Sequence, residues 1–306
     1  MNEANRPKHP RVSVPPTLRA YTPARVALDS TGASLTTRHA LEFALAHAQA
    51  RDAVHATLDV AAILDALRER GLAAVSVRSA AASRTEYPRR PDLGRTLHPD
   101  STTPLATTPL ATPPGVTTLG APSMQSYRMG GLSFAEANDR PSPAQPATNT
   151  RQPATTLTLV LADGLSALAT QRHALPLLDA LLPLLRVSTT DAPDPAAPCA
   201  LTPIVVAEQA RVALGDEIGA SLGADIAVML IGERPGLSSP DSLGAYITWN
   251  PRPGRSDAER NCVSNIRTEG LDYATAARKI AWYVGEGRRL GLTGVALRES
   301  ETALLP

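Results

Sequence analysis

Residues 203–231 read PIVVAEQARVALGDEIGASLGADIAVMLI. The two short apolar runs at 203–207 and 225–231 are typical of buried β-strands. Between them, residues 214–222 have the apolar spacing and the first-turn acidic residues of a short helix. A strand, a helix and a second strand in this order predict a β-α-β unit, whose two strands are parallel in one sheet.

The same alternation continues on both sides of this unit. Residues 157–162 predict another buried strand, and residues 167–186 predict a leucine-rich helix. Residues 246–249 predict a fourth strand, and residues 273–290 predict a closing helix. This order predicts an α/β fold, with a Rossmann-like parallel sheet flanked by helices.

A smaller, mostly helical N-terminal region precedes the sheet. Residues 37–56 predict a helix whose apolar positions recur at the spacing of one face: Leu41, Ala44, Leu45 and Ala48. Asp59 is a suitable N-cap for a second helix, and Gly71 fits the position that follows its end. The run at 73–77 predicts a short strand.

Composition divides the chain into four segments. Residues 1–20 are polar and proline-rich and predict a disordered tail, and residues 21–98 form the N-terminal α/β region, which we expect to pack on a partner. Residues 99–155 are dense in Thr and Pro, with the repeated TTPLAT as the extreme. Because proline blocks both helix and strand pairing, we expect a flexible insertion there. Residues 156–306 contain the predicted Rossmann-like sheet.

The composition of the 306 residues argues against several classes of protein. A net charge of +1 provides no field that would attract nucleic acid or an anionic membrane, and 3% aromatic residues argue against base stacking. No run of about 18 apolar residues occurs, so we expect no membrane-spanning helix. Cys199 and Cys262 lack CxxC spacing, and we expect a reduced, cytoplasmic chain without a metal site.

Two polar stretches follow predicted strands, at the place where open α/β sheets bind ligands. Residues 232–236 read GERPG, and residues 257–266 read DAERNCVSNI, which we interpret as a second polar loop. The Glu233 carboxylate can accept hydrogen bonds from amide donors on a ligand, and the flanking glycines allow close backbone approach. Cys262 lies in the second stretch, where its alternative role is that of a buried small hydrophobe.

The sequence lacks the glycine-rich motifs of nucleotide-binding loops. No GxGxxG follows the predicted strand at 157–162, and neither GxxxxGKS nor GxxxxGKT occurs. The ADGLS at the end of this strand is compatible with a ligand role. A turn in which Ser166 caps the next helix explains it at least as well.

Long motifs in this chain resemble the small, or light, subunit of ethanolamine ammonia-lyase. In and around the β-α-β unit, the motifs are RVALGDEIGASLGA, LIGERPGLSSPDSLGAYITWNPR, DAERNCVSNIRTEG and LVLADGLSALA. Upstream, TTRHALEFALAHAQARDAVHATLD and TEYPRRPDLGRTL extend the resemblance, which covers most of residues 22–98 and 156–297. The Thr/Pro-rich segment at about 99–150 is the main departure from the family.

The resemblance implies a heteromeric enzyme in which a large subunit and this chain hold adenosylcobalamin at their interface. It implies a carbon–nitrogen lyase that converts ethanolamine to acetaldehyde and ammonia by a radical mechanism. The family's catalytic residues lie on the large subunit and none lie on this chain, whereas its cobalamin contacts fall on Val212, Glu233 and Cys262. Since no DxHxxG motif occurs, we expect the cofactor to keep its own base. The resemblance places the complex in the cytoplasm or inside a bacterial microcompartment.

Two other functions are compatible with the same residues. The first is a non-catalytic, Rossmann-like module that binds cobalamin or a nucleotide, although the absent GxGxxG weakens the nucleotide version. The second is a scaffold in which the Thr/Pro-rich insertion recruits the protein to a larger assembly, although such segments are more often passive spacers.

Overall fold

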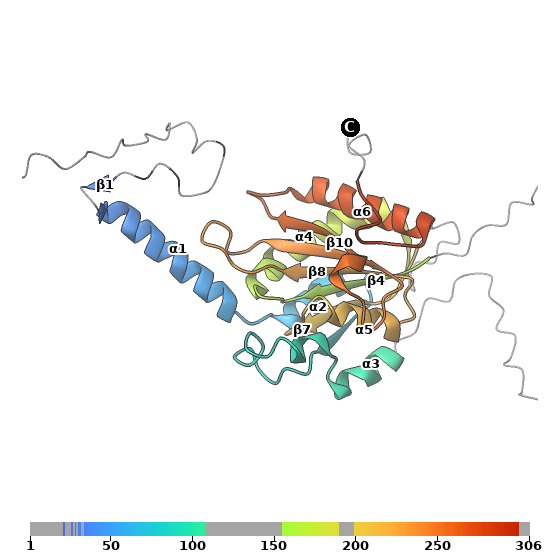
Figure 1. Ribbon diagram of the computed structural model, residues 1–306. Coiled ribbons are helices and arrows are strands. Elements are labelled where there is room, and N and C mark those ends of the chain that lie inside the picture. Colours follow the sequence, from blue (N-terminus) through green and yellow to red (C-terminus); the bar gives the residue numbers. More distant parts are fainter. Residues whose placement is uncertain are drawn as a thin grey trace, which may run out of the picture.

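Eight strands form one mixed sheet at the centre of the protein (Figure 1). The computed structural model describes most of the chain: residues 34–107, 155–189 and 199–299, with Tyr21, Val26, Leu28, Ser30 and Thr31. The sheet contains β3 (Ala74–Arg78), β4 (Thr155–Ala162), β5 (Val187–Ser188), β6 (Cys199–Leu201), β7 (Ile204–Glu208), β8 (Ile226–Gly232), β9 (Leu243–Trp249) and β10 (Arg260–Ile266). Two short strands, β1 (Ser30–Thr31) and β2 (Ser34–Leu35), pair separately.

Four parallel strands make up the centre of the sheet, in the order β3, β7, β4 and β8. The first part of β4 pairs instead with β6, which in turn pairs with β5. β9 runs antiparallel to β8, and β10 runs antiparallel to β9 at the edge of the sheet. The predicted α/β fold with a Rossmann-like sheet is confirmed, and the structure adds an antiparallel edge to it.

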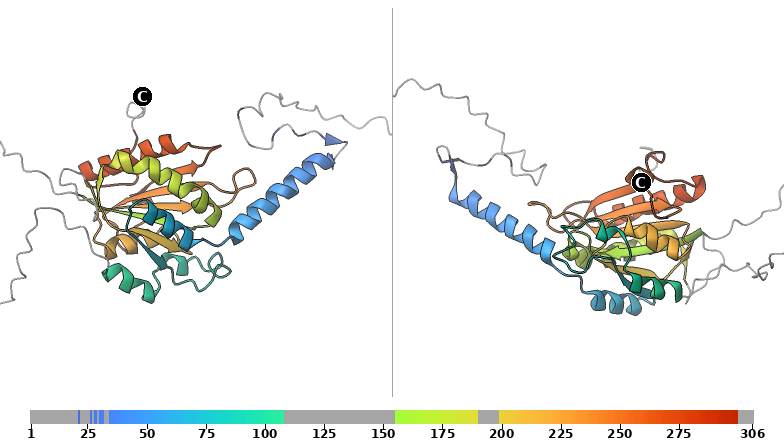
Figure 2. Two further views of the ribbon diagram at one scale, coloured as in Figure 1. Left: turned by 180° about the vertical axis from the view of Figure 1, so that it is seen from behind. Right: turned by 60° about the horizontal axis from the view of Figure 1, so that its bottom comes forward.

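Helices cover both faces of the sheet. They are α1 (Thr37–His55), α2 (Val60–Glu69), α3 (Thr102–Thr107), α4 (Ala167–Leu185), α5 (Leu214–Ser221) and α6 (Tyr273–Leu290), with 3₁₀ helices η3 (Leu93–Arg95), η4 (Pro99–Ser101) and η5 (Asp257–Glu259). α2, α4 and α6 pack on one face, where α4 and α6 lie side by side (Figure 2), and α3 and α5 pack on the other. Because side chains alternate along β4, Leu159 and Leu161 enter one core whereas Val160 and Ala162 enter the other.

The ends of α2 and α6 lie where the sequence supplies caps. The Asp59 carboxylate accepts a hydrogen bond from a first-turn amide of α2 (3.0 Å), and Gly71 follows the helix with a left-handed φ of 67°. The Asp272 carboxylate caps α6 in the same way (2.9 Å), and the helix ends at Gly291. Local capping and an amphipathic pattern agree at both helices, and the predictions for these two segments are confirmed.

Residues 102–107, the first TTPLAT, form α3, so the prediction that proline prevents a helix there is wrong. Pro104 is the third residue of α3, where a backbone amide would have no acceptor within the helix. Leu105 is 2% exposed and packs in the core beside α5. Residues 1–20 and 108–154 lie outside the described residues, so the disordered tail and the rest of the flexible insertion stay predictions.

Residues 257–266 form η5 and the edge strand β10, so the prediction of a second polar loop is wrong. Val263 and Ile266 are buried, whereas Cys262 and Ser264 are exposed. The buried positions of this edge strand include the polar Arg260 and Asn261, and the other polar side chains are exposed, so the apolar signal of a central strand is missing. Cys262 therefore lies on a strand.

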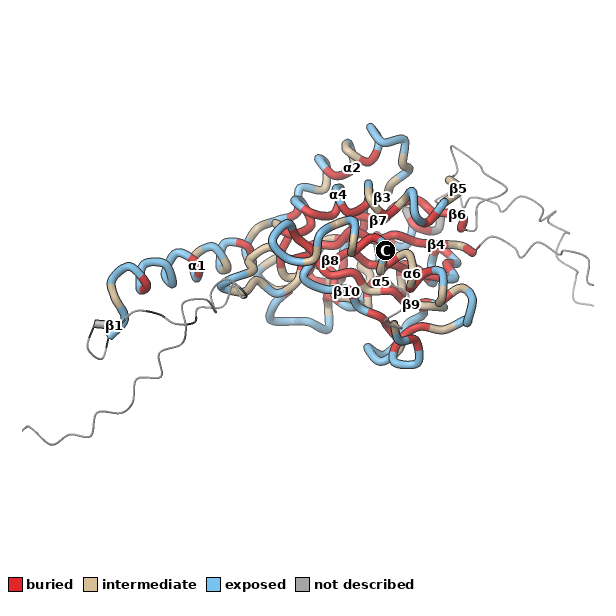
Figure 3. Tube along the Cα trace, turned by 90° about the horizontal axis from the view of Figure 1, so that it is seen from above, coloured by how far each residue is buried: buried red, intermediate tan, exposed pale blue. Residues whose placement is uncertain are grey.

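α1 forms at the predicted residues, but its predicted apolar face packs against no core formed by the described residues. The helix projects from the sheet (Figures 1 and 2) and is exposed along most of its length (Figure 3). Leu41 and Leu45 are 65% and 62% exposed, whereas the buried positions are His39, Ala46 and Ala53. None of the described helices combines the length and the apolar character that crossing a membrane requires.

The end of β8 lies so close to the β4–α4 turn that no side chain fits there. A Cβ at Gly232 would lie 2.0 Å from the carbonyl oxygen of Ser166. We predict that Gly232→Ala lowers the free energy of unfolding by about 2 kcal/mol or more, because one backbone segment must move. Urea denaturation measures this effect. Gly285→Ala on α6, where the added Cβ meets open space, is the control and raises stability by about 0.5–1 kcal/mol. Unchanged stability of Gly232→Ala would contradict the close packing.

Candidate functional site

The carboxylate of Asp163 connects loops at the carboxyl edge of the parallel strands. Its Oδ1 accepts a hydrogen bond from the Ala210 amide (3.1 Å), in the loop that follows β7. Its Oδ2 accepts from Nη1 of Arg84 (3.0 Å), in the segment that follows β3. Arg84 also donates to the carbonyl oxygens of Val54 (3.0 Å) and Gly164 (2.7 Å). One buried ion pair thus holds together three loops and the end of α1.

The segment at 85–97, TEYPRRPDLGRTL, packs against the loop that follows β7. The Tyr87 hydroxyl donates to the carbonyl oxygen of Ala210 (2.7 Å), and the guanidinium groups of Arg84 (5.1 Å) and Arg211 (4.7 Å) both lie over its buried ring. The Arg211 amide donates to the carbonyl oxygen of Gly94 (2.7 Å). A Cβ at Gly94 would lie 2.8 Å from the Tyr87 ring. These contacts fix the backbone on either side of Ala210.

Val212 follows in the same loop and shares its surroundings with Tyr246 of β9. Both side chains are half-buried and pack against the same apolar cluster, which contains Met229 and Leu214. Both also line one cavity of about 670 Å³ between this loop and the loop after β9. Val212 and Tyr246 therefore form an apolar surface that faces an open space large enough for part of a ligand.

Glu233 is the first residue after β8, and its carboxylate reaches toward the end of β10. Its amide donates to the carbonyl oxygen of Ser242 (2.9 Å), and its Oε2 accepts from the Asn265 amide (3.2 Å). A Cβ at Gly244 would lie 3.0 Å from Oε1, so the glycine leaves room for the carboxylate. The second oxygen is therefore positioned by the fold and can accept from a ligand.

Cys262 is an exposed residue of β10 and lies opposite Tyr246 in the strand register. Its exposure excludes the alternative of a buried small hydrophobe. Partial desolvation of the sulfur raises the pKa of the thiol, the hydrogen bond with Tyr246 lowers it, and the charge of Glu233 raises it. The net shift is upward, so the group at this position is a neutral thiol at neutral pH.

Tyr246 is the residue that connects the three predicted contacts. It shares an apolar cluster with Val212, it faces Cys262 across the strands, and the charge of Glu233 acts on its hydroxyl. Val212 and Cys262 line different cavities, because Cys262 belongs to a space of about 640 Å³ beside α6. Sequence reasoning treated Tyr246 only as a strand residue. Its one available signal was an aromatic hydroxyl in an otherwise apolar strand.

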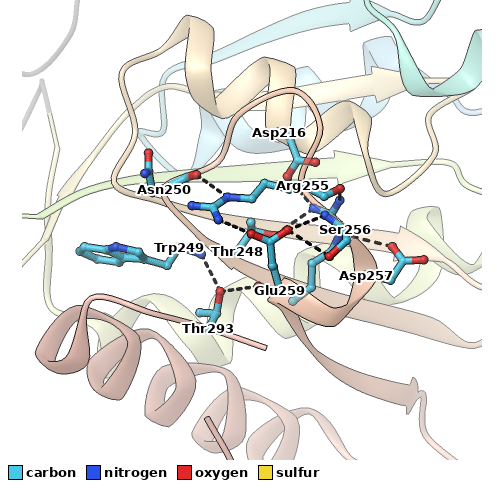
Figure 4. Close-up of polar contacts among 10 residues, drawn as sticks. Asp216, Thr248, Trp249, Asn250, Arg255, Ser256, Asp257, Glu259 and Thr293 are labelled. Carbon is cyan, nitrogen blue, oxygen red and sulfur yellow. Dashed lines mark hydrogen bonds and ion pairs between the residues drawn. The ribbon is translucent and has the colours of Figure 1, made fainter. Parts of the chain in front are cut away.

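Hydrogen bonds and ion pairs link the loop between β9 and β10 to the neighbouring strands and to α5 (Figure 4). Arg260 and Asp216 form a buried ion pair (2.6 Å) that joins β10 to the first turn of α5. Ser256 and Glu259 form a reciprocal capping box, and Arg255 pairs with Glu259. Within the described residues, no group of three His, Cys, Asp or Glu side chains is arranged to hold a metal ion.

Comparisons with known proteins identify a family for the chain. The sequence profile described as ethanolamine ammonia-lyase light chain (EutC) matches residues 14–119 and 139–298. The chain is 47% identical over 289 residues to the ethanolamine ammonia-lyase small subunit of Azotobacter vinelandii, covering 94% of this chain and 89% of that protein. It is 47% identical to the small subunit of Bradyrhizobium diazoefficiens (94% and 92% covered) and 45% identical to that of Pseudomonas aeruginosa (92% and 86% covered). The profile extends into the Thr/Pro-rich segment from both sides and leaves residues 120–138 of that segment unmatched.

Asp163 makes a pH-dependent contribution to stability whose sign follows from its burial. Burial raises the pKa of Asp163 to about 6, although the charge of Arg84 opposes the shift. An aspartate in the unfolded chain titrates near about 3.9. Between these values the folded protein binds more protons than the unfolded chain, so the contribution of Asp163 to stability falls as pH rises from about 4 to 6.

We therefore predict that the difference in unfolding free energy between wild type and Asp163→Asn decreases as pH rises from about 4 to 6 and is constant above about pH 7. Urea denaturation at stepped pH measures the difference. Asp65→Asn, at an exposed position of α2, is the control and shows no such trend. A difference that grows with pH over this range would mean that the ion pair with Arg84 outweighs burial.

Proposed function

The chain belongs to the ethanolamine ammonia-lyase small-subunit family, and from that premise we propose that it binds adenosylcobalamin together with a large subunit. Ethanolamine ammonia-lyase is a carbon–nitrogen lyase, of which the small subunit is a part. We propose which cofactor is bound, which residues of this chain contact it, and which of the two subunits carries out the reaction.

The observation that carries the proposal is the surface of Val212, Glu233, Tyr246 and Cys262. A corrin ring has flat apolar faces and a rim of amide side chains. Val212 and Tyr246 offer an apolar contact for a ring face, and Glu233 offers an acceptor for a rim amide. Cys262 adds a small neutral side chain at the exposed edge of the sheet. The residues present therefore fit the group.

The position of this surface also fits binding better than catalysis. When bound, adenosylcobalamin would supply radical chemistry by homolysis of its cobalt–carbon bond. The residues of this chain would hold and orient the cofactor, since the Glu233 carboxylate already bonds the Asn265 amide and the Cys262 thiol is neutral. We place the substrate pocket and the conversion of ethanolamine to acetaldehyde and ammonia on the large subunit.

A nucleotide-binding role is disfavoured by the turn between β4 and α4. Ser166 caps α4 by accepting from the Ala169 amide (3.3 Å), which confirms the prediction of a capping turn. The Leu165 amide donates to the carbonyl oxygen of Gly232 (2.9 Å). A Cβ at Gly164 would lie 2.2 Å from that oxygen. The backbone of β8 thus occupies the place where a phosphate would approach the helix.

Reconstitution tests the proposed function. The chain is co-expressed with the large subunit, supplied with adenosylcobalamin and ethanolamine, and assayed for acetaldehyde. We expect turnover by the complex and none by either subunit alone. A folded complex that binds adenosylcobalamin but gives no acetaldehyde would contradict the assigned reaction, and a folded complex that binds no cobalamin would contradict the assigned cofactor.

Glu233→Ala tests the assigned contact within that complex. We predict that it raises the dissociation constant for adenosylcobalamin about tenfold, because a charge-assisted hydrogen bond is lost, and leaves the KM for ethanolamine within about twofold. Equilibrium titration of cofactor absorbance measures the first quantity. Glu69→Ala, an exposed position on α2, is the control and changes neither. Equal effects on cofactor and substrate would argue against a cofactor contact.

A further inference from the structure

The cavity beside Val212 carries cationic side chains that the proposed corrin contacts do not use. Arg95, Arg211 and Arg255 line it together with Val212 and Tyr246. Arg255 is paired with Glu259. Among the described residues, no carboxylate forms an ion pair with Arg95 or Arg211. Two unpaired guanidinium groups therefore face the same space.

Arg211 is held in place with part of its hydrogen-bonding capacity unused. Its guanidinium lies over the Tyr87 ring (4.7 Å to the centroid), and its amide is bonded to Gly94. Its Nε is buried and has no hydrogen-bond partner in the structure. The other guanidinium nitrogens of Arg211 also bond no acceptor among the described residues, so an anion in the cavity that Arg211 lines could engage them.

The backbone beside Arg211 also carries hydrogen-bond donors that are not in use. Val212 and Ala213 line the cavity, and their amides donate to no acceptor among the described residues. They lead directly into α5, whose N-terminus has no side-chain cap. Free amides at the start of a helix favour an anion, and here they accompany a cavity and a buried arginine.

The acidic groups of the cavity are already engaged. Asp216 is paired with the buried Arg260 (2.6 Å), and Asp257 lies 3.4 Å from the same guanidinium. Glu217 accepts a hydrogen bond from the Leu97 amide (2.6 Å). Their charge is therefore partly neutralised within the protein, whereas that of Arg95 and Arg211 is not.

We propose that this cavity binds a phosphate ester, with Arg211 as the principal ligand and Arg95 as a second cation at its exposed rim. The inference rests on the proposed function. If the corrin ring lies against Val212, the phosphate that links its nucleotide tail to the ring is the anion that the cavity would receive. Free inorganic phosphate has the same chemistry and is the alternative source.

Three cofactor forms separate these possibilities in direct binding measurements on the complex of the two subunits. Adenosylcobalamin has both the phosphate and the base, adenosylcobinamide phosphate has only the phosphate, and adenosylcobinamide has neither. We predict that Arg211→Gln weakens the first two forms about tenfold or more and the third less than about twofold. Added inorganic phosphate competes with neither phosphate-bearing form at millimolar concentration.

Two further variants test whether the effect is specific to the arginines that line the cavity. Arg95→Gln lies at an exposed position, so it leaves folding intact and shows the same selectivity with a smaller effect. Arg89→Gln, an exposed position of the same segment, is the matched control and has no effect on any form. Circular dichroism confirms that each variant is folded.

Several results would overturn the phosphate site. Equal weakening of all three forms by Arg211→Gln would show that the side chain only supports the loop. No weakening of any form, together with binding of inorganic phosphate that Arg211→Gln abolishes, would show that the cavity takes free phosphate and that the cofactor phosphate lies elsewhere. Failure of the wild-type complex to bind any of the three forms would instead contradict the proposed function on which the site rests.

Discussion

Asp163 joins the loops that leave three neighbouring strands, β3, β7 and β4, beyond the end of their strand pairing. Its carboxylate bonds the loop after β7 and the segment after β3, and Arg84 extends the contact to the end of α1. Because both charges are buried, each depends on the other. Removing one partner of a buried pair leaves an uncompensated charge and costs about 3–5 kcal/mol. This pair therefore positions the loops after β3, β4 and β7 at the carboxyl edge of the sheet.

The antiparallel strands β9 and β10 extend the candidate site beyond the loops that the Arg84–Asp163 pair positions. β9 and β10 continue the sheet beyond β8, and they place Tyr246 and Cys262 as direct cross-strand neighbours. Side chains that face each other across strands lie on the same face of a sheet, so both lie on the side of Val212. A purely parallel sheet would end with β8, and only loops such as the one that begins at Glu233 would be available to a ligand there.

The sequence predicted those parts of the fold that local chemistry determines. α2 and α6 have both a cap and an amphipathic face, and β4 and β8 are mostly apolar, buried runs. β10 was missed because only some of its positions are buried, and α3 was missed because a proline in a first turn resembles a helix breaker. The sequence predicted α1 and its apolar face, but that face is exposed among the described residues, so nothing in the sequence indicated what it contacts.

The candidate site was predictable only in part, because it depends on contacts between residues that are far apart in the chain. Val212, Glu233 and Cys262 could be named from motifs, whereas their link through Tyr246 is a matter of strand register. The Arg84–Asp163 pair joins residues far apart in the chain, and no local pattern signals it. Arg211 was part of a quoted motif, but its unused donor becomes visible only when its neighbours are in place.

A structure of the complex of both subunits with adenosylcobalamin is the most direct test of the central claim. We predict that the corrin ring lies against Val212 and Tyr246, with a rim amide within hydrogen-bonding distance of the Glu233 carboxylate and Cys262 in contact with the ring edge. A corrin ring that lies entirely within the large subunit, with no contact to the carboxyl edge of this sheet, would contradict the claim.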